Sequence, residues 1–218
     1  MSNAARYDWL LLDNDGVLVD SERYYFLATQ EAFAAHGQSL SLGDDREAQR
    51  AGGKVWQRFA DPQLARQARA WRDQRYQSHL RSAPIDIPGI QQTLTDLAGR
   101  LTMAIVSTAK PEDFALIHDQ RELVQHMSLV LVSGDYPRAK PAPDPYLTAM
   151  ARLGARPERT LAVEDSVRGM QAALAAGIDC VVVASEFQQG ESFSQATYQL
   201  ERFEQLPAVV DGSFRSVT

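Results

Sequence analysis

The chain has 218 residues, of which 44% are hydrophobic and 23% charged, and its formal net charge is −6. This composition is ordinary for a globular protein, and the length allows one large or two small domains. The acidic balance argues against a general nucleic-acid binder, and no apolar run approaches the roughly 20 residues of a membrane span.

The first predicted element is a buried strand at Trp9–Leu12, an apolar run that leads into Asp13 to Gly16. Asp13 and Asp15 repel each other at the carboxyl end of this strand, which is the edge where open α/β sheets bind ligands. Carboxylates so close together are usually balanced by a cation or a shared proton. Mg²⁺, which binds carboxylate, water and phosphate oxygens, is the cation that we expect there.

Helices are predicted over the next part of the chain, from Ser21 to about Ser82. Residues 24–35 place their apolar side chains at helical spacing, and Gly37 is a typical stop signal. Residues 64–80 are rich in Ala, Arg and Gln, with apolar residues at the same spacing.

The length of this helical segment predicts the domain organisation. Asp13 and Ser107 each follow an apolar run, yet 93 residues lie between them. A direct crossover between neighbouring strands needs only about a dozen residues. We therefore expect a small helical cap at residues 19–83, inserted into a doubly wound α/β core that consists of residues 1–18 and 84–218.

Three further apolar runs are predicted as buried strands, each followed by polar residues. In chain order, the aspartate pair is joined by a hydroxyl pair, a lysine and an acidic pair. The runs and their polar ends are 102–106 with Ser107 and Thr108, 129–132 with Lys140, and 161–163 with Glu164 and Asp165.

Helix and strand patterns alternate through the second half of the predicted core. The tail after Ser185 is polar and weakly patterned, apart from one apolar segment that we expect to return to the core. The expected elements are helices at 146–153 and 167–176, strands at 160–163 and 180–184, and the apolar segment 206–210.

The set of polar strand ends suits phosphoryl transfer through an aspartyl intermediate, which needs a nucleophile, an acid/base carboxylate, oxygen donors and a metal site. Over essentially its whole length, the chain resembles the haloacid dehalogenase superfamily, in the phosphatase and β-phosphoglucomutase-like branch with a helical (C1) cap. Four motifs carry this resemblance: DxDG from Asp13, the hydroxyl of Ser107, KPxPDxY from Lys140, and EDS from Glu164.

The resemblance implies a role for each catalytic candidate. Asp13 is the expected nucleophile, and Asp15 is the expected general acid and base. Ser107 is expected to hold a phosphoryl oxygen, although the pattern leaves open whether Thr108 does so instead. Lys140 is expected to neutralise charge on the nucleophile and on the transferring phosphate.

A Mg²⁺ site is expected from four acidic residues, Asp13, Asp15, Glu164 and Asp165. Asp165 is the expected direct ligand, Glu164 binds directly or through water, and the resemblance adds the backbone carbonyl of Asp15. The alternative is that the acidic pair and Ser166 only cap a helix. The four histidines match no motif position, and we expect them at the surface or in the core.

Substrate choice is expected to lie in the cap, which in this family covers the site during transfer. Gly53 and Lys54 belong to a loop that resembles the family's substrate loop, although a turn with solvated charges explains them nearly as well. Lys110 is a further candidate for contact with a distal phosphate or carboxylate of the substrate. The expected substrate is a small phosphomonoester, such as a sugar phosphate or a hydroxy-acid phosphate.

Three functions compete: a Mg²⁺-dependent phosphatase, a sugar-phosphate mutase and a non-catalytic relative. Asp15 favours transfer from a phosphate ester, because dehalogenases and phosphonate-cleaving members lack an acid there. Mutase-like members usually carry a histidine ten residues further on, where this chain has Tyr25. No motif residue is missing, which argues against a non-catalytic protein.

The remaining expectations concern the cellular setting. Cys180 is the only cysteine, which excludes an intrachain disulfide and fits a reducing compartment. The segment before the first apolar run, residues 1–6, is short and polar. We therefore expect no signal peptide and a cytoplasmic protein. We expect a monomer, with a dimer as the alternative, and neither nucleic acid nor membrane as a partner.

Overall fold

The computed structural model divides the chain into two compact units. Residues 21–85 form one unit, and they interrupt the other, which consists of residues 1–20 and 86–218. The structure describes residues 6–50, 55–183, 185–188 and 190–214.

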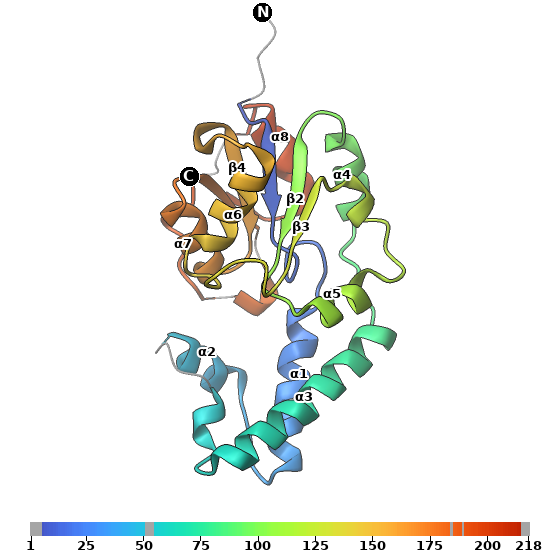
Figure 1. Ribbon diagram of the computed structural model, residues 1–218, viewed down its shortest axis with the longest axis vertical. Helices are drawn as coiled ribbons and strands as arrows, with labels where there is room; N and C mark the ends of the chain where they lie inside the picture. The colour runs from blue at the N-terminus through green and yellow to red at the C-terminus, as the bar shows by residue number, and fades with distance from the viewer. Residues whose placement is uncertain (1–5, 51–54, 184, 189, 215–218) are drawn as a thin grey trace, which may run out of the picture. The chain divides into compact units, whose positions relative to one another are not determined.

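The larger unit is built on a parallel sheet (Figure 1). Its strands are β1 (Trp9–Leu12), β2 (Thr102–Val106), β3 (Leu129–Leu131), β4 (Thr160–Glu164), β5 (Asp179–Val183) and β6 (Tyr198–Leu200). Within the described residues these six strands lie in the order β3-β2-β1-β4-β5-β6, and every neighbouring pair is parallel. The chain therefore reverses its direction of travel across the sheet between β1 and β4, a switch point where open α/β sheets bind ligands.

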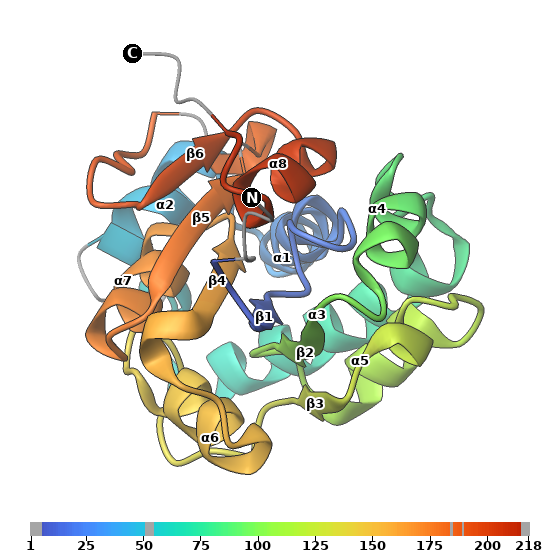
Figure 2. The same cartoon turned by 90° about the horizontal axis from the view of Figure 1, so that it is seen from above.

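Helices cover both faces of this sheet. They are α4 (Ile90–Leu97), α5 (Pro111–His118), α6 (Asp144–Leu153), α7 (Val167–Ala175) and α8 (Leu206–Val210), with short 3-10 turns η2 (Val124–His126), η3 (Pro157–Arg159), η4 (Glu186–Gln188) and η5 (Phe203–Gln205). Figure 2 shows α6 and α7 on one face and α4 and α8 on the other, and each of these pairs is in contact. The predicted doubly wound α/β fold is confirmed.

The register of the central strands brings their polar ends to one edge. Leu12 pairs with Ile105 of β2 and with Val163 of β4. The ladder continues one residue further, because the backbone N–H of Asp13 donates to Val163 O at 2.9 Å. The residues that follow β1, β2 and β4 are therefore neighbours, and most side chains of the strands behind them are buried.

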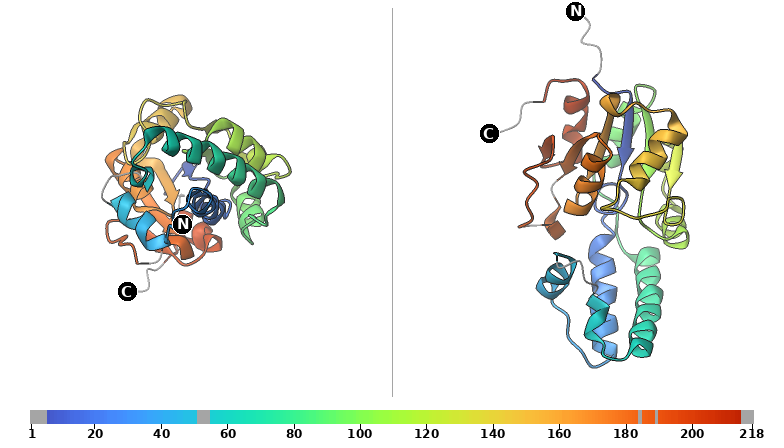
Figure 3. Two further views of the ribbon diagram at one scale, coloured as in Figure 1. Left: turned by 90° about the horizontal axis from the view of Figure 1, so that it is seen from below. Right: turned by 60° about the vertical axis from the view of Figure 1, so that its left-hand side comes forward.

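The smaller unit is helical, with α1 (Glu22–Ala35), α2 (Leu42–Arg50), the turn η1 (Val55–Arg58) and α3 (Pro62–Ser82). Figure 3 shows α1 and α3 side by side, and they pack along their length. The predicted stop after α1 is present, since Gly37 adopts φ +72°. Asp61 caps α3 by accepting a hydrogen bond from Gln63 N at 2.8 Å, and Pro62 occupies the first turn.

An aromatic cluster forms the core of this smaller unit. Phe33 on α1 packs against Trp56 and Phe59, with ring centroids 5.5 Å and 4.8 Å away. Ala65 and Ala68 of α3 belong to the same cluster. Among the described helices of the chain, none is long and apolar enough to cross a membrane.

The predicted elements are present, with small shifts at their ends. The third strand ends at Leu131 rather than at residue 132, and β5 begins one residue earlier than expected. The sequence did not predict β6, a three-residue strand at the edge of the sheet within the weakly patterned tail. Cys180 is fully buried in β5.

Candidate active site

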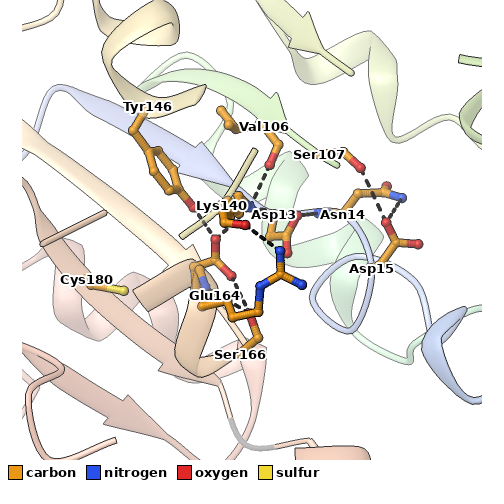
Figure 4. A network of polar contacts seen from close by, with 12 residues as sticks. Asp13, Asn14, Asp15, Val106, Ser107, Lys140, Tyr146, Glu164, Ser166 and Cys180 are labelled. Carbon is orange, nitrogen blue, oxygen red and sulfur yellow. Dashed lines mark hydrogen bonds and ion pairs between the residues drawn. The ribbon is translucent and has the colours of Figure 1, made fainter. Parts of the chain in front are cut away.

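Asp13, the expected nucleophile, lies at the end of β1 and is 9% exposed (Figure 4). The ammonium group of Lys140 lies 3.0 Å from Asp13 Oδ1, and the backbone N–H of Asn14 donates to the same oxygen at 2.8 Å. Two donors on one oxygen fix the orientation of the carboxylate. The position of the Asp13 carboxylate therefore depends on the turn after β1, through Asn14, and on the segment before α6, through Lys140.

Lys140 is buried and makes three polar contacts. Its Nζ lies 2.6 Å from Glu164 Oε1 and donates to Val106 O at 2.8 Å, in addition to its ion pair with Asp13. Burial lowers the pKa of Lys140, but the charges of Asp13 and Glu164 outweigh burial and hold that pKa above its ordinary value. Lys140 is therefore a buried positive charge beside Asp13, the predicted nucleophile.

Glu164 is fully buried at the end of β4. Its carboxylate accepts hydrogen bonds from the hydroxyl of Tyr146 on α6 and from Ser166 Oγ, the latter at 3.5 Å. Burial raises the pKa of Glu164 to about 7, with Asp13 adding to this shift and Lys140 opposing it. Burial also raises the pKa of Tyr146 well above its ordinary value, so its hydroxyl remains a donor.

Three buried carboxylates form a group that suits a divalent cation. Asp13, Glu164 and Asp165 each offer one oxygen, and these oxygens lie within 4.8 Å of one another. When all three are ionised, their charge exceeds that of Lys140 by two units. Oxygen donors with this charge match the preference of Mg²⁺ and Ca²⁺. The donor set therefore fits the predicted metal.

Two glycines leave room for these carboxylates. A Cβ at Gly16, which has φ +78°, would lie 2.0 Å from Asp165 Oδ2. A Cβ at Gly169, on the first turn of α7, would lie 1.8 Å from Glu164 Oε2. Both distances are far shorter than any van der Waals contact, so the two acidic side chains depend on glycine at these positions.

Gly169→Ala should destabilise the protein by about 2 kcal/mol, because the methyl group displaces a buried carboxylate that Lys140 and Tyr146 hold. Replacing glycine by alanine within a helix normally raises the free energy of unfolding by about 0.5–1 kcal/mol. Gly43→Ala on α2 is the matched control, since the nearest atom to its Cβ is Ser41 Oγ at 3.6 Å. Urea unfolding gives the free energy of unfolding of both variants relative to wild type. A Gly169→Ala protein that is more stable than wild type would contradict the packing argument.

Asp15 lies two residues after Asp13, in the loop that follows β1. Its Oδ2 accepts hydrogen bonds from Ser107 Oγ at 3.3 Å and from Asn14 Nδ2 at 3.4 Å. Ser107 is fully buried, and its hydroxyl also accepts from Ala109 N at 3.0 Å. Thr108 is exposed, so of the two hydroxyls it is Ser107 that the structure brings to the aspartate pair.

Three cap or loop residues were predicted to contact the substrate: Gly53, Lys54 and Lys110. Gly53 and Lys54 lie outside the described residues, so their predicted contact with substrate stays a prediction. Lys110 is exposed at the start of α5, where it occupies the N-cap position. Its predicted role in binding a distal group also stays a prediction.

The sequence analysis missed three residues of this region. Tyr146 was part of a motif but had no role, although the structure places its hydroxyl on Glu164. Asn14, fully buried between the two aspartates, was passed over as the variable position of DxDG. His118 was expected at the surface or in the core, yet its Nε2 lies 2.8 Å from Asn14 Oδ1. The helical spacing of Phe114, Ile117 and His118 on α5 was the only available signal.

Comparisons with known proteins agree with this architecture. A family model described as haloacid dehalogenase-like hydrolase matches residues 10–183. Protein CbbY from Rhodobacter capsulatus is 31% identical over 210 residues, covering 88% of this chain and 91% of that protein. A phosphoglycolate phosphatase from Photorhabdus laumondii is 32% identical over 197 residues, covering 85% of this chain and 83% of that protein.

The fold also matches solved structures. A crystal structure of a CbbY mutant from Rhodobacter sphaeroides, in complex with xylulose-(1,5)bisphosphate, superposes with a TM-score of 0.79. It covers 92% of this chain and 96% of its own at 24% identity, a likeness that shows the fold alone. The matched family model, in contrast, spans the strands that carry Asp13, Ser107 and Glu164. The chain therefore belongs to the haloacid dehalogenase-like hydrolases and is an enzyme of that family.

Proposed function

We propose that this protein is a Mg²⁺-dependent phosphatase that hydrolyses a small phosphorylated metabolite through an aspartyl-phosphate. The observation that carries this proposal is the pairing of Asp13 with the buried ammonium of Lys140, beside Asp15 and two further carboxylates. An oriented carboxylate next to a fixed positive charge suits attack on phosphorus.

In the first step, the Asp13 carboxylate forms a bond to phosphorus while the bond from phosphorus to the leaving oxygen breaks. Asp15 gives a proton to that oxygen, so the substrate leaves as a neutral alcohol. In the second step, Asp15 takes a proton from the water that attacks phosphorus. Inorganic phosphate is released, and Asp13 returns to its carboxylate form. Lys140 and Ser107 are proposed to hold oxygens of the transferring group.

Asp13, Glu164, Asp165 and the backbone carbonyl of Asp15 are the residues that would hold Mg²⁺. When bound, the ion would supply positive charge that stabilises the transferring phosphoryl oxygens. Glu164 has a second task in this arrangement, since it holds Lys140 in place through its Oε1.

The substrate class follows from the relatives rather than from this chain's own cap. One relative is a phosphatase of the hydroxy-acid phosphate phosphoglycolate, and the CbbY mutant structure is a complex with a sugar bisphosphate. Both compounds are small phosphomonoesters with a second anionic group, which supports a substrate of the same class here. Tyr25, at the position where mutase-like members usually carry histidine, supports hydrolysis over isomerisation.

Metal removal tests the proposal directly. Phosphate release from p-nitrophenyl phosphate and from a panel of phosphorylated metabolites should fall at least about 10²-fold in EDTA and return with Mg²⁺. A bisphosphate-dependent isomerisation assay on the same preparation distinguishes a sugar-phosphate mutase from a phosphatase. Full turnover in chelator would contradict the metal assignment, and an isomerised sugar phosphate as the main product would contradict the phosphatase.

A further inference from the structure

His118 lies at the end of α5, and its side chain contacts the loop that carries the two aspartates. We propose that His118 is a positioning residue, which acts through the side-chain amide of Asn14 to hold the carboxyl group of Asp15. The inference rests on the proposed function, in which Asp15 is the general acid and base. His118 lies 104 positions along the chain from Asn14 and belongs to none of the four sequence motifs.

The contact forms a continuous chain of polar groups. His118 Nε2 lies 2.8 Å from Asn14 Oδ1, and Asn14 Nδ2 donates to Asp15 Oδ2 at 3.4 Å. Asn14 is fully buried, so water cannot take the place of a lost hydrogen-bond partner of its side-chain amide. The dashed line between Asn14 and Asp15 in Figure 4 marks the second of these contacts.

The direction of these hydrogen bonds follows from the acceptor at the end. A carboxylate accepts only, so the NH₂ group of Asn14 must face Asp15, and its carbonyl oxygen must face His118. The ring nitrogen at that oxygen must then carry a hydrogen, which assigns the Nε2–H tautomer to His118. A histidine in this tautomer fixes which way the buried amide points.

The surroundings keep His118 neutral and in place. Burial lowers the pKa of His118 to about 4, and the positive charge of Arg121 adds to this effect. The ring packs on Phe114, with centroids 4.3 Å apart. Within the described residues Nδ1 is buried without a hydrogen-bond partner, a cost that an apolar side chain would avoid. Stability alone therefore does not explain a histidine at this position.

The two hydrogen bonds that Asp15 Oδ2 accepts from Asn14 and Ser107 are both long. Ser107 Oγ donates to the same Oδ2 at 3.3 Å, so the two donors come from different segments of the chain. If the amide of Asn14 turns away, a single long hydrogen bond from Ser107 remains of this pair. General acid catalysis requires the proton donor within hydrogen-bonding reach of the leaving oxygen, so loss of position lowers its contribution.

A series of aryl phosphates tests this role. Departure of a basic leaving group, as from phenyl phosphate, needs protonation, whereas p-nitrophenolate leaves readily without it. In His118→Leu, kcat/KM should fall about 10- to 100-fold for phenyl phosphate and less than about threefold for p-nitrophenyl phosphate, because general acid catalysis is worth about 10²–10⁴-fold. Asp15→Asn should show the same steeper dependence on the leaving group.

Two further variants separate positioning from packing. His118→Gln places an amide N–H near the position of Nε2 and should restore most of the lost rate for phenyl phosphate. His126→Leu, which removes a histidine from η2 that contacts Gln91, is the matched control and should behave as wild type. Equal losses on both aryl phosphates, or no rescue by glutamine, would overturn the inference.

Hydrogen exchange of the Asn14 side-chain amide, followed by NMR, tests the contact between His118 and Asn14 without measuring turnover. Exchange should be at least about tenfold faster in His118→Leu than in wild type, because the amide is no longer held. Unchanged exchange would overturn the relay even in an active phosphatase. A wild-type protein that hydrolyses no phosphomonoester would instead contradict the proposed function, while the exchange measurement would still report on His118 and Asn14.

Discussion

Asp13→Asn should lower kcat by about 10⁵-fold, because an amide oxygen cannot attack phosphorus to form the covalent intermediate. The free energy of unfolding should stay the same or rise. Asp13 is one of three buried carboxylates whose oxygens lie within 4.8 Å of one another, so its removal relieves repulsion in that group. Phosphate release and urea unfolding of the same preparation measure both effects.

The same substitution should also act on Glu164. Burial is the main cause of its raised pKa, and the charge of Asp13 raises it further. Removing that charge should lower the pKa of Glu164 from its value of about 7, which a ¹³C NMR titration of the carboxyl group would detect. Asp211→Asn is the control, since Asp211 pairs with Arg100 at the surface and should leave turnover unchanged. Appreciable turnover in clean Asp13→Asn would refute the choice of nucleophile.

Lys140→Met should affect both activity and stability. Methionine keeps the length of the side chain but leaves Asp13 and Glu164 facing each other without the ammonium. Removing one member of a buried charged group costs about 3–5 kcal/mol, and we expect that loss in the free energy of unfolding. Loss of the charge beside the transferring phosphate should lower kcat by about 10³-fold.

Arg138→Met is the matched control for Lys140→Met. Arg138 pairs with Asp144 at 2.8 Å, but its side chain is 71% exposed. An exposed ion pair is worth only about 0–1 kcal/mol, so this variant should unfold nearly as the wild type does. If both variants lost similar stability, burial of Lys140 would not be the source of the effect. Substitution of Lys140 is thus expected to lower the free energy of unfolding, whereas substitution of Asp13 should leave it unchanged or raise it.

Much of the fold followed from the sequence, because its signals are local. The strand at Trp9–Leu12 and the strand at Thr102–Val106 have the predicted bounds, since short apolar runs flanked by polar residues mark buried parallel strands. Gly37 adopts a positive φ after the end of α1, as its position in the pattern predicted, and Gly154 and Gly177 do so close to the ends of α6 and α7. The strand β6 was missed because it has only three residues, at the edge of the sheet, and lacks a periodic pattern.

The motif residues could be named from the sequence, but their hydrogen-bond partners could not. Strand ends in a parallel sheet share an edge, so Asp13, Ser107 and Glu164 were expected to converge. The choice between Ser107 and Thr108 needed the structure, because successive residues beyond a strand point to opposite sides and only the register decides which is buried.

Tertiary structure alone decided the contacts that complete the site. Tyr146 reaches Glu164 because α6 packs across the sheet, and His118 reaches Asn14 because α5 ends beside the loop after β1. Such contacts join residues far apart in the chain, and helical periodicity gives the face of a helix but not which loop that face meets. The sequence by itself therefore indicated which groups are candidates for the chemistry, while the packing of helices on the sheet decided which groups contact them.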